Sequence, residues 1–160
     1  MSMKKIALTA GTFDPVTTGH IDIISRATEI FDEVIVAVYT NPAKNTLLTE
    51  ETRLKAVSAA VADMPNVRAV KGEGLIADFA KKCGACAIVK GVRGIADFSY
   101  EEEMALANRA VSGIETLLLF SSAECMHISS TLVRELYRCG RDYSAYIPAA
   151  AYEIVSENLK

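Results

Sequence analysis

The sequence has no long hydrophobic run and no excess of basic residues. Its first apolar stretch, residues 6–10, has five residues, which is too short for the apolar segment of a signal peptide. No later stretch approaches the ~18 apolar residues of a membrane span. Its 17 lysines and arginines are outnumbered by 20 acidic residues, so a general nucleic-acid-binding face is not expected. We therefore expect a cytoplasmic protein with no membrane or nucleic-acid partner.

Cysteine and histidine are also scarce, with four and two copies. Cys83 and Cys86 form a C-x-x-C motif, but a redox motif of this kind opens a helix. This one lies between a helical pattern and an apolar run. A zinc site requires a second close pair of ligands, which Cys125 and Cys139 do not form. We interpret the four thiols as structural, and we assign no residue as a metal ligand.

The apolar content is that of an ordinary globular protein. Hydrophobic residues make up 51% of the 160, which is enough for one domain with its own core. No linker, repeat or low-complexity tract divides the chain. Residues 1–160 are therefore expected to form a single domain.

Short apolar runs alternate with helical patterns along almost the whole chain. Five runs rich in Val, Ile and Leu indicate strands buried on both faces of a parallel sheet: residues 6–10, 34–39, 67–70, 87–89 and 116–120. Helical patterns occupy residues 21–31, 49–61, 76–80, 97–111 and 129–137, and a last one follows Pro148. The alternation predicts an α/β fold: a doubly wound, Rossmann-like domain with a five-stranded parallel sheet and helices on both faces. Such sheets bind ligands at the carboxyl ends of their strands.

The loop after the first predicted strand, residues 11–20, combines features that phosphate binding requires. It is neither a Walker A sequence nor a dinucleotide-binding Gly-x-Gly-x-x-Gly. Gly11 lets a ligand approach the backbone closely, and Gly19 with His20 opens a helix whose free N–H groups attract anions. Thr12 offers a hydroxyl, and His20 a ring N–H, to phosphate oxygens.

Three more loops bring cations or hydroxyls to the same edge of the sheet. The second strand leads to Lys44, and the fourth leads to Lys90 and Arg93. After the fifth strand, Ser129–Thr131 stand at a helix N-terminus, where they form either an ordinary helix cap or a second cradle for oxyanions. The convergence of four loops on one edge favours the second interpretation.

Two segments resemble the paired motifs of the nucleotidyltransferase superfamily: Gly11-Thr12-Phe13-Asp14-Pro15-x-x-x-Gly19-His20 and Ile128-Ser129-Ser130-Thr131. Two more resemble the bacterial phosphopantetheine adenylyltransferase family: Lys90-Gly91-Val92-Arg93-Gly94-Ile95-Ala96-Asp97-Phe98-x-Tyr100-Glu101 and Asn41-Pro42-x-Lys44. This resemblance covers essentially the whole chain. It implies that the protein transfers the adenylyl group of ATP to 4′-phosphopantetheine, giving dephospho-coenzyme A and pyrophosphate, with Mg²⁺ as cofactor. It further implies a homohexamer and feedback inhibition by coenzyme A.

The resemblance also implies roles for individual residues. Catalysis would fall to His20, Thr12 and Lys44, which stabilise charge on the α-phosphate. The acceptor would be held by Thr12, Lys44, Ile76 and Lys90. ATP would be contacted by Thr12, Phe13, His20, Gly91, Val92, Arg93, Glu101, Cys125, Met126, His127, Ile128, Ser129, Ser130 and Thr131.

Several positions depart from the family pattern. Lys90 stands where an arginine is more usual, so a point charge replaces a planar fork. Residues 125–127 replace a more aromatic stretch. Thr17 replaces the first histidine of the His-x-Gly-His motif in cytidylyltransferases and nicotinamide-nucleotide adenylyltransferases, which favours the phosphopantetheine acceptor. The alternatives are another acceptor, such as nicotinamide mononucleotide or a phospho-alcohol, and a nucleotide-binding regulatory protein without turnover.

Overall fold

The structure is a computed structural model that describes residues 4–41 and 45–159. Its elements follow the order β1 (Ile6–Gly11), α1 (Thr18–Ala27), β2 (Glu33–Val38), α2 (Glu50–Ala60), β3 (Val67–Lys71), α3 (Ile76–Lys82), β4 (Ala87–Val92), α4 (Ile95–Ser112), β5 (Glu115–Phe120), η1 (Ala123–Cys125), α5 (Ser130–Arg138), η2 (Ser144–Tyr146) and α6 (Ala149–Asn158). Strand and helix alternate through β5, as the sequence predicts. Within the described ranges, no helix has both the length and the apolar character to span a membrane.

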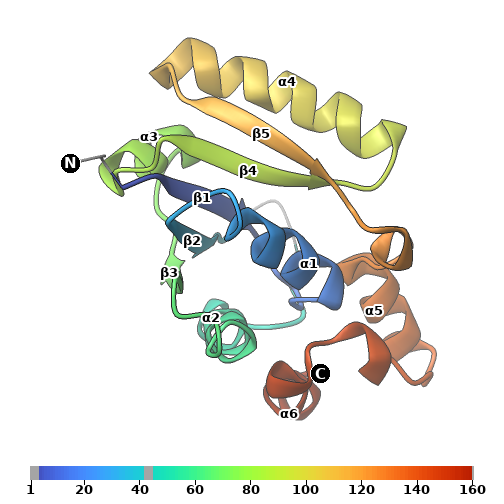
Figure 1. The fold of residues 1–160 in the computed structure, drawn as a ribbon. Coiled ribbons are helices and arrows are strands. Elements are labelled where there is room, and N and C mark those ends of the chain that lie inside the picture. Colours follow the sequence, from blue (N-terminus) through green and yellow to red (C-terminus); the bar gives the residue numbers. More distant parts are fainter. Residues whose placement is uncertain (1–3, 42–44, 160) are drawn as a thin grey trace.

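In the described part of the chain the five strands form one parallel sheet in the order β3-β2-β1-β4-β5 (Figure 1). The chain moves outward from β1 to β3 and then returns to the other side of β1 with β4. The sheet therefore has its switch point between β1 and β4, where doubly wound folds bind their ligands. The predicted fold class is confirmed.

The predicted strand bounds agree with the structure to within one residue at each end, except in β4. This strand continues three residues beyond the predicted end, to Val92. Lys90 and Val92 pair there with Leu118 and Phe120 of β5, so ladder hydrogen bonds carry the strand through a sequence that contains a lysine and a glycine. Lys90 thus projects from a strand and not from a loop.

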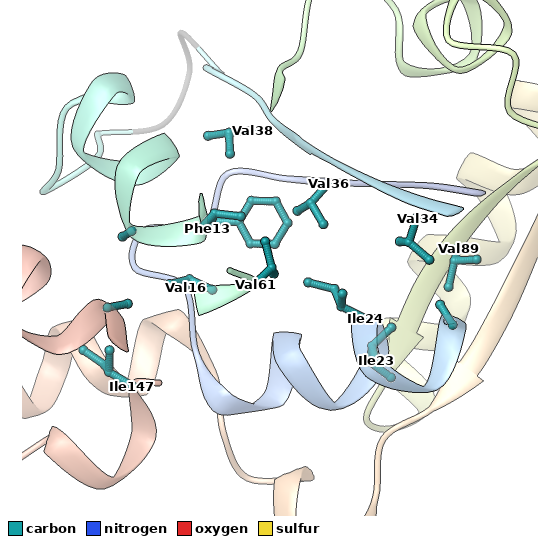
Figure 2. Packing of buried hydrophobic residues seen from close by; sticks show 14 of the residues in the cluster. Phe13, Val16, Ile23, Ile24, Val34, Val36, Val38, Val61, Val89 and Ile147 are labelled. Carbon is teal, nitrogen blue, oxygen red and sulfur yellow. The ribbon is translucent and has the colours of Figure 1, made fainter. Parts of the chain in front are cut away.

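Helices cover both faces of the sheet. The chain places α1 and α2 on one face and α3 and α4 on the other (Figure 1). Side chains of β2 alternate between the two cores: Val34, Val36 and Val38 lie in the larger cluster, beside α1 and α2 (Figure 2). Ile35 and Ala37 pack in the smaller cluster, with residues of α3.

The prediction that strands are buried on both faces is wrong for β3 and β5. Both are edge strands, and none of their residues is fully buried. An edge strand has no neighbouring strand on one side and is therefore less buried. The apolar composition of a strand does not show whether it lies at the edge or inside the sheet. The prediction holds best for β1, β2 and β4, which lie inside the sheet.

Side-chain caps fix where three helices begin. The hydroxyl of Thr17 accepts a hydrogen bond in the first turn of α1, Thr49 does so for α2, and Ser129 does so for α5. Ser129 caps a helix as one of its two predicted interpretations states, and Thr49 stands at the start of the helical pattern predicted over residues 49–61. Two of these helix N-termini, those of α1 and α5, border the site described below.

The C-x-x-C motif closes a helix, as the sequence placed it. Cys83 is the C-cap of α3, and the Cys86 backbone N–H donates to the Ile6 carbonyl (2.8 Å) at the start of the sheet. All four cysteines lie within the described residues and are free thiols.

Candidate active site

A cleft of about 600 Å³ opens at the carboxyl edge of the sheet, beside the switch point. Its walls come from the loop after β1, the first turns of α1 and α5, the end of β4 and the start of α4. This volume is in the range of a small-molecule site. Most of the predicted site residues line it: Thr12, Phe13, His20, Lys90, Gly91, Arg93, Glu101, Ile128, Ser129, Ser130 and Thr131.

The remaining predicted residues lie elsewhere or outside the described ranges. Ile76, the first residue of α3, packs against the smaller core, and the Val92 side chain is buried. Residues 125–127 lie in η1 and the turn after it, where the His127 ring meets Tyr146 edge-on (5.8 Å between ring centroids). Lys44 falls outside the described residues. The functional roles of these residues stay predictions.

Phe13 gives the loop after β1 its shape. Its φ of 51° lies in the left-handed region, which bulky residues seldom adopt. Its buried ring meets the His20 ring edge-on, with 5.0 Å between centroids. A Cβ on Gly11 would lie 3.2 Å from the Phe13 ring. Gly11 therefore makes room for this phenyl ring, and because it also lines the cleft, the close approach of a ligand to its backbone stays a prediction.

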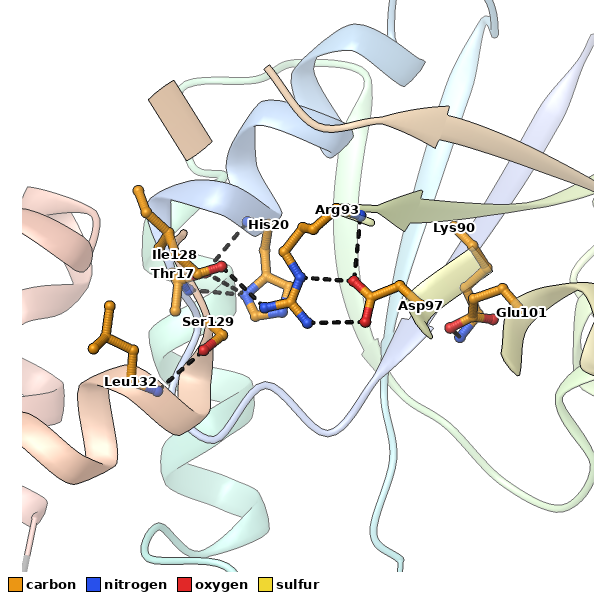
Figure 3. Close-up of polar contacts among 9 residues, drawn as sticks. All are labelled: Thr17, His20, Lys90, Arg93, Asp97, Glu101, Ile128, Ser129 and Leu132. Atoms are coloured by element: carbon orange, nitrogen blue, oxygen red, sulfur yellow. Dashed lines mark hydrogen bonds and ion pairs between the residues drawn. The ribbon is translucent and has the colours of Figure 1, made fainter. Parts of the chain in front are cut away.

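His20 is the third residue of α1, and its ring forms a capping box with Thr17 (Figure 3). The Thr17 backbone N–H donates to His20 Nδ1 (2.9 Å), and the His20 backbone N–H donates to Thr17 Oγ1 (3.4 Å). A nitrogen that accepts a hydrogen bond carries no proton, so the hydrogen-bond network assigns the proton of the neutral ring to Nε2. The cap thus selects the tautomer and leaves an Nε2–H donor on a residue that lines the cleft.

The surroundings keep this ring neutral. Burial, and then the nearby positive charges of Arg93 and Lys90, lower the pKa of His20 to about 4. At neutral pH the imidazole is therefore uncharged. It can donate one hydrogen bond to an anion.

Arg93 is fixed between α4 and the loop before α5 (Figure 3). Its Nε and Nη2 donate to the two carboxylate oxygens of Asp97 (2.8 and 3.2 Å), and Nη1 donates to the Ile128 carbonyl (3.2 Å). The hydrogen bonds from Arg93 hold the pKa of Asp97 below its usual value. The guanidinium is thereby positioned as a fixed positive charge on the wall of the cleft.

Lys90 of β4 forms a second pair with Glu101, which lies one turn beyond Asp97 on α4. Lys90 Nζ lies 3.5 Å from Glu101 Oε1, and the two side chains are 19% and 15% exposed. The other carboxylate oxygen, Oε2, is buried and has no hydrogen-bond partner among the described residues. Within those same ranges, no group of three or more His, Cys, Asp or Glu is arranged to hold a metal ion.

The N-terminus of α5 is tied to the loop after β1. Ser130 Oγ donates to the Pro15 carbonyl (2.8 Å), and Arg134 Nη1 donates to the Asp14 carbonyl (2.8 Å). Ser129 caps the helix and also lines the cleft. The two interpretations of the Ser-Ser-Thr run are therefore compatible. Arg134, one turn further on, lines the cleft as well.

Two buried charged residues at or beside the cleft, Arg53 and Asp14, received no role in the sequence analysis. Arg53 of α2 donates to carbonyls at the ends of β1 and β2, and Asp14 accepts from two backbone N–H groups of the segment before α2. The helical spacing contained a signal for Arg53, because it lies three and four residues before Ala56 and Val57 on the buried side of α2.

Comparisons with known proteins show the family and the fold of this chain. Residues 8–136 match the family model described as cytidylyltransferase-like. A relative from Symbiobacterium thermophilum named phosphopantetheine adenylyltransferase is 49% identical over 143 residues, covering 89% of this chain and 88% of that protein. One of the same name from Caldanaerobacter subterraneus is 41% identical over 157 residues, covering 98% of each. The solved structure of a candidate nicotinate-nucleotide adenylyltransferase from Vibrio parahaemolyticus, 21% identical, covers 97% of this chain and 93% of its own with a TM-score of 0.71, which shows the shared fold.

Proposed function

The chain belongs to the phosphopantetheine adenylyltransferase family, within the cytidylyltransferase-like group, and we propose how its cleft carries out the family's reaction. The protein is a nucleotidyltransferase of coenzyme A biosynthesis. It transfers the adenylyl group of ATP to 4′-phosphopantetheine, releasing dephospho-coenzyme A and pyrophosphate. The observation that carries the proposed mechanism is the neutral His20 imidazole, held by the α1 cap with its proton on Nε2.

The reaction is an in-line displacement at the α-phosphorus of ATP. A phosphate oxygen of 4′-phosphopantetheine forms the new P–O bond, and the bond to the bridging oxygen of the β-phosphate breaks as pyrophosphate leaves with the electron pair. The attacking phosphate is already ionised at neutral pH, because its second pKa is about 6. No general base is required, so catalysis rests on positioning and on stabilising charge.

Each cleft residue then has a role in holding phosphate oxygens. His20 Nε2–H and the Thr12 hydroxyl donate to the α-phosphate, together with the predicted contribution of Lys44. Lys90 holds the acceptor phosphate. Arg93 and Ser129 hold the departing pyrophosphate at the N-terminus of α5, where free N–H groups favour anions.

Mg²⁺ is proposed as the cofactor, and the donor set fits an ion that arrives with ATP. The described residues form no metal cage of their own, whereas Glu101 Oε2 lacks a protein partner there. Mg²⁺ is commonly held by substrate phosphates and one or two carboxylates. When bound, it would neutralise part of the triphosphate charge. EDTA should abolish pyrophosphate release and excess Mg²⁺ should restore it; turnover unaffected by EDTA would argue against the ion.

We further propose that the chain forms a single domain and works in the cytoplasm, where ATP is abundant. We also propose that six copies assemble into a homohexamer. Apolar side chains exposed on α4, among them Ile95, Leu106 and Val111, support assembly. Light scattering should give the mass of six chains, and Leu106→Glu should lower it. A monomeric wild-type protein would refute the hexamer.

Coenzyme A is proposed as a feedback inhibitor. Coenzyme A contains both a pantetheine arm and an adenosine unit. It could therefore occupy the acceptor-binding and the ATP-binding residues of the cleft at the same time. Added coenzyme A should slow pyrophosphate release most strongly when both substrates are below saturation.

The acceptor is tested directly. The protein is incubated with ATP, Mg²⁺ and 4′-phosphopantetheine, and in parallel with nicotinamide mononucleotide or a phospho-alcohol, and pyrophosphate is measured. Among these acceptors, only 4′-phosphopantetheine is expected to cause release of pyrophosphate. Release only with another acceptor would refute the specific function, and ATP binding without release under any condition would favour a regulatory protein.

A further inference from the structure

Arg53 is a charged residue inside the protein. Its side chain extends from α2 and is 1% exposed, among the largest fully buried side chains in the described part of the chain. Burying a guanidinium is costly, and an apolar residue of similar volume would stabilise many such positions at least as well. A role beyond stability would account for an arginine at this point of the helix.

The contacts of Arg53 join two strand-end loops. Nη1 donates to the carbonyls of Thr12 (2.6 Å) and Tyr39 (2.8 Å), and Nη2 donates to Thr40 Oγ1 (3.2 Å). Thr12 follows β1 and lines the cleft, whereas Tyr39 and Thr40 follow β2. The planar group therefore sets the distance between the two loops where both leave the sheet.

Asp14 adds a second tie between the same segments. It is 3% exposed, and its two carboxylate oxygens accept from the backbone N–H groups of Leu47 and Leu48, each at 2.9 Å. Asn45 and Thr46, just before them, line the cleft. Arg53 thus fixes one end of the segment between β2 and α2, and Asp14 fixes the other.

We propose that Arg53 is a positioning residue for adenylyl transfer, which holds the Thr12 backbone, and through it the phosphate-binding loop, at a fixed separation from the end of β2. The inference rests on the proposed function only for its kinetic readout. Arg53 does not line the cleft and acts through Thr12. Small displacements of a positioned group can lower a rate by about 10²-fold.

Three variants separate positioning from stability. Arg53→Met removes all three hydrogen bonds, and Arg53→Lys keeps the charge but replaces the planar fork with a single ammonium. Val57→Ala is the matched control, because Val57 is fully buried on the same side of α2 and makes none of these bonds. For each variant, kcat and KM for both substrates are measured together with the melting temperature and backbone hydrogen exchange.

The expected result is a loss in kcat of about 10²-fold for Arg53→Met and about tenfold for Arg53→Lys, with each KM within about threefold of wild type. Val57→Ala should lower the melting temperature with little change in kcat. The Tyr39 amide, which donates to the Gly11 carbonyl (2.8 Å), should exchange at least about tenfold faster in both Arg53 variants but not in the control.

A folded Arg53→Met with wild-type kcat, or a kcat loss equal to that of Val57→Ala, would overturn the proposal. If Arg53→Met does not fold, Arg53→Lys replaces it in the test. A wild-type kcat in Arg53→Lys, or a kcat loss equal to that of Val57→Ala, would then overturn the proposal. If the wild-type protein does not turn over 4′-phosphopantetheine, the proposed function fails by itself. Exchange at Tyr39 then decides whether Arg53 holds the loops: unchanged exchange overturns the inference, and faster exchange supports it.

Discussion

Acid should destabilise the wild-type protein more than a His20→Gln variant. Burial, followed by the charges of Arg93 and Lys90, lowers the pKa of His20 to about 4 in the folded chain, whereas an unfolded histidine titrates near about 6.5. Between these two values the unfolded chain binds a proton that the folded chain does not. The stabilising effect of the neutral ring is therefore complete above the unfolded pKa and declines as the pH falls toward 4.

The magnitude follows from the two pKa values. With His20 at about 4 in the folded state and about 6.5 when unfolded, linkage gives a loss of about 2 kcal/mol between pH 8 and pH 5. Domains of this kind are stable by only about 5–15 kcal/mol. The contribution of a single histidine should thus be measurable.

Glutamine is the informative replacement because it is common at the third position of a capping box. It can accept the hydrogen bond from the Thr17 backbone N–H and does not titrate. Urea unfolding of both proteins at pH 8 and pH 5 isolates the histidine, because every other titrating group is shared. The wild-type protein should lose about 2 kcal/mol more than His20→Gln.

NMR provides a second reading, since the chain has two histidines and the variant identifies the His20 signals. An imidazole that titrates near 6.5, or equal pH dependence in the two proteins, would refute the neutral donor. His20 would then contribute a positively charged imidazolium, and not a neutral hydrogen-bond donor, to the site.

Three more substitutions test the chemistry and the packing of the site. His20→Ala should lower kcat by roughly 10²–10³, the usual loss for one preorganised donor, as measured by pyrophosphate release; wild-type turnover in a folded variant would remove His20 from the mechanism. Lys90→Arg should lower KM for 4′-phosphopantetheine by roughly threefold to tenfold, because a planar fork can bind phosphate through two hydrogen bonds; an unchanged KM would separate Lys90 from the acceptor. Gly91→Ala should destabilise by roughly 1–3 kcal/mol, because a Cβ there would lie 2.7 Å from Ile23 Cγ1; an unchanged urea midpoint would contradict this packing.

The sequence predicted the sheet well because its signals are local. Short apolar runs without regular polar alternation mark the inner strands, and Thr49 and Ser129 mark helix starts by their own hydrogen bonds. The end of β4 was missed for the opposite reason. Lys90 extends that strand by pairing with β5. This pairing joins residues far apart in the chain, so the sequence around Lys90 does not indicate it.

The candidate site was predicted in part. Strand-end position and residue chemistry identified His20 and Arg93, but not how they are held. The lowered pKa of His20 depends on burial and on two cations supplied by β4 and the loop after it. Arg53 was overlooked because two of its three partners are backbone carbonyls, which are the same for every sequence.

Helix α4 contacts the cleft through its first turns and is exposed on its outer surface. Its first turns carry Asp97 and Glu101, which hold Arg93 and Lys90 in place, while Leu106 in a later turn is 65% exposed. The outer surface of α4 is also the one proposed to meet a neighbouring subunit, so a compound that inserted between subunits at Leu106 and tilted the helix would disturb both cations without entering the cleft. Its inhibition would be non-competitive with ATP and with the acceptor, because it would bind outside both substrate sites.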